Sequence, residues 1–117
     1  MQNQIHFDEV AFHFPELRSI MTHCGQPWTD EAVSGMAHWH NVFMSCTCVA
    51  PKYWPLQFVQ FINTRGKEKM MFGTEYPTID WTRAREDIDA LNLRPDAASL
   101  CFAENAKRIY KWDPDLY

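Results

Sequence analysis

Three apolar segments of this chain each lead into side chains that can do chemistry. His23 follows the first segment, Cys46 and Cys48 end the second, and Glu75 follows the third. A histidine and a carboxylate at one site can hold a divalent metal ion or form an acid–base pair. We therefore take His23 and Glu75 as the candidate catalytic and metal-binding residues, although a single histidine or glutamate is more often structural or solvated.

The four cysteines favour a structural interpretation. Cys46 and Cys48 form a C-x-C pair, but structural zinc sites generally combine two such pairs, and the sequence contains no second pair. The spacing also differs from that of a dense disulfide framework. We therefore expect Cys24, Cys46, Cys48 and Cys101 to be buried, reduced thiols.

Strands and helices must alternate along the chain to position these residues. Short apolar runs predict the strands, and apolar residues at helical spacing predict the helices. Asn105 is expected to cap a restart within the last helix. The expected order is helix 5–14, strand 17–22, helix 29–41, strand 42–46, helix 56–64, strand 69–72, helix 82–91 and a last helix from Pro95. This alternation indicates an α/β fold with a parallel sheet, in which ligands bind at the carboxyl ends of the strands.

Composition excludes several classes of protein. The hydrophobic fraction of 46% and the aromatic fraction of 15% are too high for a disordered chain. The mean hydropathy of -0.41 and the lack of a long apolar run argue against a membrane partner. The net charge of -4, without a cluster of Lys or Arg, gives no support for binding nucleic acid. No apolar signal segment follows Met1, so we expect a cytoplasmic protein.

Five motifs taken together resemble the carboxyl-terminal half of the amidohydrolase-related family (amidohydrolase 2). This family includes enzymes similar to aminocarboxymuconate-semialdehyde decarboxylase. The resemblance extends from Ile5 to Trp112, and the Phe-Gly-Thr-x-Tyr-Pro element is fairly specific. The motifs are Phe14–Leu17, Met21–Trp28, Asn41–Phe43, Phe72–Pro77 and Glu104–Ala106.

The resemblance implies a distorted (β/α)₈ barrel that binds a divalent metal, most often zinc, and acts on a small carboxylate or amide. Residues 1–117 would then form the last three strand–helix units of a TIM-barrel-like domain, with parallel strands. His23 matches the family's histidine after the sixth strand, which serves in substrate activation or metal-site chemistry. Glu75 matches the aspartate after the eighth strand, which binds metal or carries a proton.

Two departures from the family pattern bear on activity. The amino-terminal His-x-His pair and the histidine of the fifth strand have no counterpart, and Glu75 places its carboxylate one methylene further from the backbone than aspartate would. A complete barrel takes about 250 residues. We therefore expect an incomplete metal-dependent hydrolase or decarboxylase that forms a homo-oligomer or associates with an amino-terminal half. A non-catalytic α/β interaction or oligomerisation module and a truncated reading frame are the alternatives.

Overall fold

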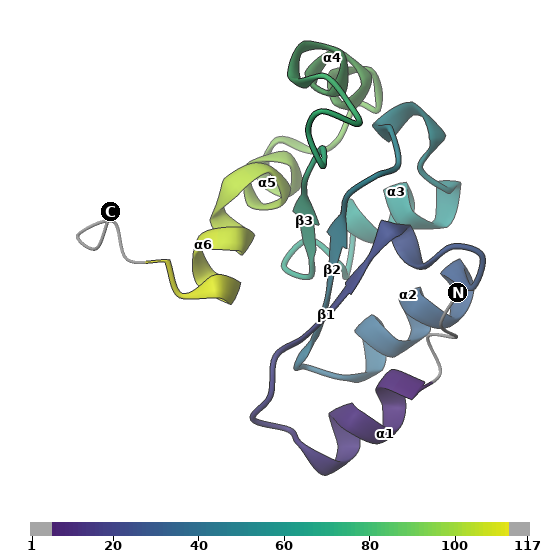
Figure 1. The fold of residues 1–117 in the computed structure, drawn as a ribbon, viewed down its shortest axis with the longest axis vertical. Helices are drawn as coiled ribbons and strands as arrows, with labels where there is room; N and C mark the ends of the chain where they lie inside the picture. The colour runs from purple at the N-terminus through teal and green to yellow at the C-terminus, as the bar shows by residue number, and fades with distance from the viewer. Residues whose placement is uncertain (1–5, 113–117) are drawn as a thin grey trace.

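A parallel sheet of three short strands lies at the centre of the computed structural model, which describes residues 6–112 (Figure 1). The strands, in spatial order, are β1 (Ser19–Thr22), β2 (Val42–Cys46) and β3 (Met70–Phe72). Ser19 pairs with Val42 and Met44 pairs with Met70, so all three strands run toward one edge. The predicted α/β fold with parallel strands is confirmed.

Helices flank the sheet in the predicted order. Figure 1 shows α1, α2 and α3 near β1 and β2, whereas α5 and α6 lie near β3. The helices are α1 (His6–His13), α2 (Thr29–His38), α3 (Leu56–Ile62), α4 (Trp81–Ala90), α5 (Pro95–Ser99) and α6 (Asn105–Tyr110), with a π-helical turn at Leu100–Glu104 and 3₁₀ turns at His23–Gly25 and Pro51–Tyr53. Within residues 6–112, no helix is long and apolar enough to span a bilayer.

The strand residues alternate between two hydrophobic clusters, as side chains in a strand must. Val42, Met44 and Met70 belong to the larger cluster, which also contains residues of α2, α3, α4 and α5. Phe43 and Met71 point the other way and pack with Ile109 of α6. Because both faces of β2 are buried, its sequence is apolar without interruption over its first three residues, which is typical of a strand in a parallel sheet.

Side-chain donors hold the amino ends of the strands. The buried Asn41 amide donates to the carbonyls of Phe14 and Leu17, at 3.1 and 3.0 Å, in the segment that leads into β1. Lys69 Nζ, immediately before β3, donates to the carbonyl of His40 at 2.7 Å. These bonds tie the segments that precede β1 and β3 to the segment that precedes β2.

Asn105 performs the same task at the start of β3. Its Nδ2 donates to the carbonyls of Lys67 and Met70, at 2.7 and 2.8 Å, and the residue is completely buried. The prediction that Asn105 caps a helical restart is therefore wrong. The preceding π-helical turn continues directly into α6, so no free helix end exists there for Asn105 to cap.

Replacing Asn105 with alanine is expected to lower the free energy of unfolding by about 2 kcal/mol, because one buried and one partly buried carbonyl lose their donor. Alanine suits a helix better than asparagine does, so helix propensity opposes the loss. Urea unfolding followed by circular dichroism measures the change, with the exposed Gln60→Ala as the control. A loss below about 0.5 kcal/mol, which is ordinary for a surface substitution, would contradict the anchoring role.

Three of the four cysteines belong to the interior. Cys24, Cys46 and Cys101 are buried, whereas Cys48 is exposed. Burial raises the pKa of the Cys101 thiol to about 12 and that of the Cys46 thiol well above its usual value. The prediction of buried thiols is confirmed for these three and wrong for Cys48, because β2 ends at Cys46 and the chain turns before it reaches Cys48.

Thiol labelling of the folded chain is expected to modify Cys48 alone at a fast rate. The other thiols react only after unfolding, because burial shields all three and also disfavours the thiolate at Cys46 and Cys101. Ellman's reagent should therefore release one equivalent of chromophore rapidly from the native chain and four equivalents in denaturant. A fast native phase of two or more equivalents would contradict the assigned burial.

Candidate functional site

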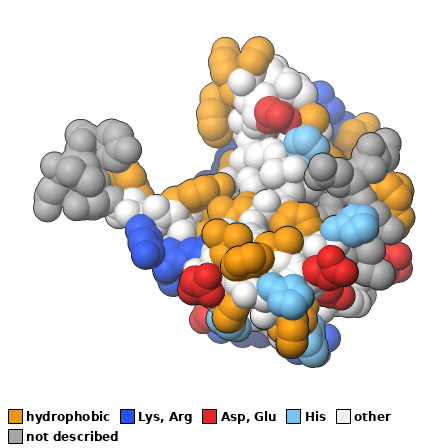
Figure 2. Space-filling model, turned by 60° about the horizontal axis from the view of Figure 1, so that its bottom comes forward, with side chains coloured by type: hydrophobic (Ala, Val, Ile, Leu, Met, Phe, Trp, Pro, Cys, Tyr) orange, Lys and Arg blue, Asp and Glu red, His pale blue; other side chains and the backbone are white. Residues whose placement is uncertain are grey.

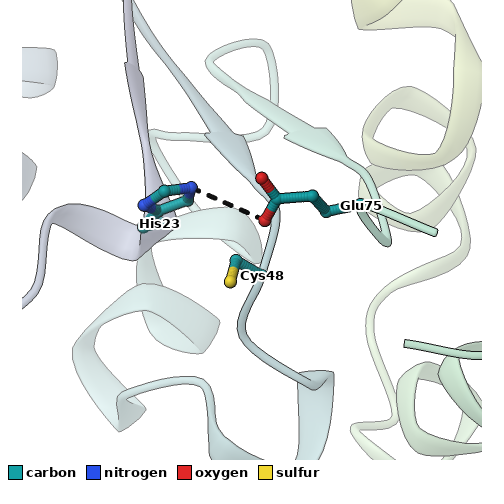
Figure 3. Close-up of side chains that lie close together, drawn as sticks. All are labelled: His23, Cys48 and Glu75. Atoms are coloured by element: carbon teal, nitrogen blue, oxygen red, sulfur yellow. Dashed lines mark ion pairs between the residues drawn. The ribbon is translucent and has the colours of Figure 1, made fainter. Parts of the chain in front are cut away.

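His23, Cys48 and Glu75 meet at the carboxyl edge of the sheet (Figure 3). His23 directly follows β1, Cys48 lies two residues beyond β2, and Glu75 lies three residues beyond β3. One potential ligand atom from each side chain lies within 4.8 Å of the other two. His23 Nε2 is 3.7 Å from Glu75 Oε2, and Figure 3 shows these two side chains pointing toward one another.

The backbone of all three residues adopts the left-handed conformation. The φ angles are 57° at His23, 62° at Cys48 and 54° at Glu75. Residues with a Cβ seldom occupy this region, and such conformations gather at functional sites, where the surrounding structure offsets a cost of about 1–3 kcal/mol each. The same strained conformation therefore occurs at the end of each of three neighbouring strands.

Gly73 allows the loops after β2 and β3 to approach each other. A Cβ atom at this position would lie 2.6 Å from Cγ2 of Thr47, which is closer than real Cβ contacts permit. Thr47 directly precedes Cys48, and Gly73 lies two residues before Glu75. The absence of a side chain at Gly73 therefore brings the segments carrying two of the site residues together.

The site is partly open to solvent. The side chains of His23 and Glu75 are 53% and 48% exposed, so a small molecule can reach both. A hydrogen bond to Glu75 raises the pKa of the Cys48 thiol above its usual value, and a smaller contribution comes from desolvation. In the absence of a cation, the Cys48 thiol therefore donates a hydrogen bond to the Glu75 carboxylate.

The donor atoms fit a divalent transition metal by type. Imidazole nitrogen, thiolate sulfur and carboxylate oxygen are all zinc ligands, and catalytic zinc commonly has three protein ligands and an open position. Ligand atoms around a tetrahedral zinc lie about 3.5 Å apart, given zinc–ligand bonds of about 2.0–2.3 Å. The separations of up to 4.8 Å would have to shorten by roughly 1 Å on this basis. Exposed side chains can make that adjustment by rotation.

The structure brings together the two residues that the sequence singled out and adds a third. His23 and Glu75 lie at one sheet edge, as parallel pairing of their strands predicts. The C-x-C spacing of Cys46 and Cys48 is a signal for a structural zinc pair, and it does not predict that Cys48 alone joins His23 and Glu75. The sequence signal for Cys48 is that it follows a buried strand, as His23 and Glu75 do.

A separate hollow between α1 and α2 contains none of these residues. It has a volume of about 570 Å³, and Asp8, Asp30, Glu31, His38 and Trp39 are among the residues that line it. Asp8 Oδ1 accepts a hydrogen bond from the Trp39 indole at 2.7 Å, so one carboxylate oxygen in the hollow already has a partner. The chemistry of the three strand ends therefore lies outside this hollow.

Comparison with known proteins connects this arrangement to a family. A family model described as Amidohydrolase matches residues 1–112. A comparison with curated proteins finds no match. Among solved structures, the uncharacterized TIM-barrel protein Bb4693 from Bordetella bronchiseptica is similar, with a TM-score of 0.82 and 27% sequence identity. The similarity covers 93% of this chain and 39% of the Bordetella chain.

The two comparisons agree with the resemblance carried by the sequence motifs. The three parallel strands and their helices correspond to part of a TIM-barrel structure, of which this chain spans 39%. The match of the family model extends over almost the whole chain, including His23, Cys48 and Glu75. The chain therefore belongs to the amidohydrolase family.

Proposed function

We propose that this chain contributes the carboxyl-terminal strands of a metal-dependent hydrolase or decarboxylase that acts on a small carboxylate or amide. The observation that carries the proposal is the approach of His23 Nε2 to Glu75 Oε2, at 3.7 Å, beyond two strands of a parallel sheet. Ligands of parallel α/β proteins bind at this edge. Family membership supports the reaction class.

Glu75 and His23 are the residues that would hold or serve a divalent ion, with zinc as the first candidate. When bound, such an ion activates a water molecule or polarises a carbonyl or carboxylate oxygen. Glu75 supplies a carboxylate oxygen to the ion or accepts a proton from the reacting group. His23 supplies a ring nitrogen to the ion or, if other residues hold the ion, exchanges a proton at Nε2, which faces Glu75 and is open enough to meet a substrate.

Association with further strand–helix units would complete the barrel. Within residues 6–112, β1 and β3 each pair on one side only, so each presents an open edge. Phe12, Phe14 and Leu17, which lie in or near α1, are at least half exposed. Figure 2, in which the end of the molecule that carries α1 in Figure 1 comes forward, shows hydrophobic side chains gathered among acidic side chains and histidines. We propose an amino-terminal half of the barrel, or a second copy of the chain, as the partner.

The same open edges favour a second candidate function, a non-catalytic interaction or oligomerisation module. In that case the exposed apolar side chains serve binding alone, and Glu75 and His23 have no chemical task. The two candidates differ in one consequence, because catalysis depends on Glu75 and binding through the sheet edges does not. Both are compatible with a cytoplasmic location, where free thiols such as these four remain reduced.

Glu75→Gln is expected to lower hydrolysis or decarboxylation by at least about 100-fold, because it removes an anionic ligand and proton acceptor. The assay uses this chain assembled with the amino-terminal half of the barrel, loaded with Zn²⁺, and a panel of aromatic carboxylates and N-acyl amides. Glu86→Gln, an exposed glutamate on α4, is the matched control and should retain full activity. Undiminished turnover by the Glu75→Gln assembly would overturn the catalytic proposal and favour the interaction module.

A further inference from the structure

We propose that His23, Cys48 and Glu75 form a three-ligand site for a thiophilic divalent cation, with Zn²⁺ as the expected ion, within this chain alone. The three ligand atoms all lie within 4.8 Å of one another and come from the ends of three adjacent strands. The site draws no ligand from another part of a barrel. The inference holds whether or not the assembled protein is an enzyme.

Cys48 is distinguished from the other cysteines by where its sulfur lies. Cys46, two residues earlier, is completely buried on the face of β2 that belongs to the larger hydrophobic cluster. Regular alternation would place Cys48 on that same face, but the strand has ended and the chain adopts a φ of 62° at Cys48. Its side chain is exposed and lies beside Glu75 and His23 (Figure 3).

The charges of the three groups suit a dication. A thiolate and a carboxylate supply two negative charges, and a neutral imidazole supplies a lone pair, so a bound divalent ion leaves the site without net charge. On binding, the Cys48 S–H bond is replaced by a sulfur–metal bond, and the proton leaves to solvent. Glu75, which accepts a hydrogen bond from the thiol in the absence of an ion, is then free to offer a carboxylate oxygen to the metal.

The sulfur ligand sets the selectivity of the site. Thiolate and imidazole ligands favour Zn²⁺, Co²⁺ and Cd²⁺, whereas Mg²⁺ and Mn²⁺ prefer sites made of oxygen atoms. Half-exposed ligand side chains also leave room for a solvent molecule or a substrate atom at a fourth position. The expected ligand is therefore a single zinc-like ion with one open coordination position.

Cobalt titration of the full 117-residue chain, freed of metal by chelation and kept reduced, tests the inference. We expect a thiolate-to-cobalt charge-transfer band that saturates at one equivalent and disappears when Zn²⁺ is added. Cys48→Ser should abolish the band. His23→Asn and Glu75→Gln should each weaken cobalt binding at least about tenfold. Removal of a residue that only hydrogen-bonds to a metal ligand already lowers metal affinity by this factor.

Matched controls separate a folded site from adventitious thiol binding. His40→Asn and Glu86→Gln remove an exposed histidine and an exposed glutamate outside the cluster, and both should bind Co²⁺ as the unchanged chain does. Zn²⁺ should raise the melting temperature of the unchanged chain but not of Cys48→Ser, because an ion that binds the native state stabilises it. Mg²⁺ should not raise the melting temperature of either chain.

A missing charge-transfer band in the unchanged chain would overturn the inference, and so would a band that survives Cys48→Ser. These outcomes are independent of catalysis. Loss of the cobalt band together with Glu75-dependent turnover would reject the three-ligand site and leave the proposed function standing. An intact cobalt site without turnover in the assembled barrel would reject the proposed function and leave the three-ligand site standing.

Discussion

Parallel pairing of β1, β2 and β3 is the constraint on which the candidate site depends. The register brings the carboxyl ends of the strands to one edge, and His23, Cys48 and Glu75 lie one, two and three residues beyond them. Antiparallel pairing of any one strand would move its residue to the opposite edge of the sheet. The proximity of these three side chains is thus a consequence of sheet topology, and each loop has only to direct a short segment.

The two ends of the sheet have different tasks. At the amino ends, Asn41, Lys69 and Asn105 bind backbone carbonyls and hold the strands in place. At the carboxyl ends, the backbone adopts strained left-handed conformations and presents polar side chains to solvent. The buried core and the polar anchors offset that strain, which is the usual relation between a scaffold and the site that it carries.

Local sequence patterns predicted the order of elements because burial is periodic along this chain. The strand 42–46 was predicted with the bounds that the structure has, since β2 is almost entirely buried and its apolar run is unambiguous. Asn105 and Cys48 were misjudged for the opposite reason, because their roles depend on residues distant in sequence or on where a strand ends. Asn105 binds a carbonyl 38 residues away, which no local pattern reveals. The proximity of His23 and Glu75 could be predicted only because parallel strands bring their carboxyl ends to the same edge of a sheet.

The central claim is the proposal that a divalent metal ion binds His23, Cys48 and Glu75 at this edge of the sheet. X-ray absorption spectroscopy of the chain loaded with one equivalent of Zn²⁺ tests it most directly, because it counts the atoms bound to the metal. We predict one sulfur at about 2.3 Å and three nitrogen or oxygen atoms at about 2.0–2.2 Å, two from the protein and one from solvent. A shell without sulfur, or one with several sulfurs, would contradict it.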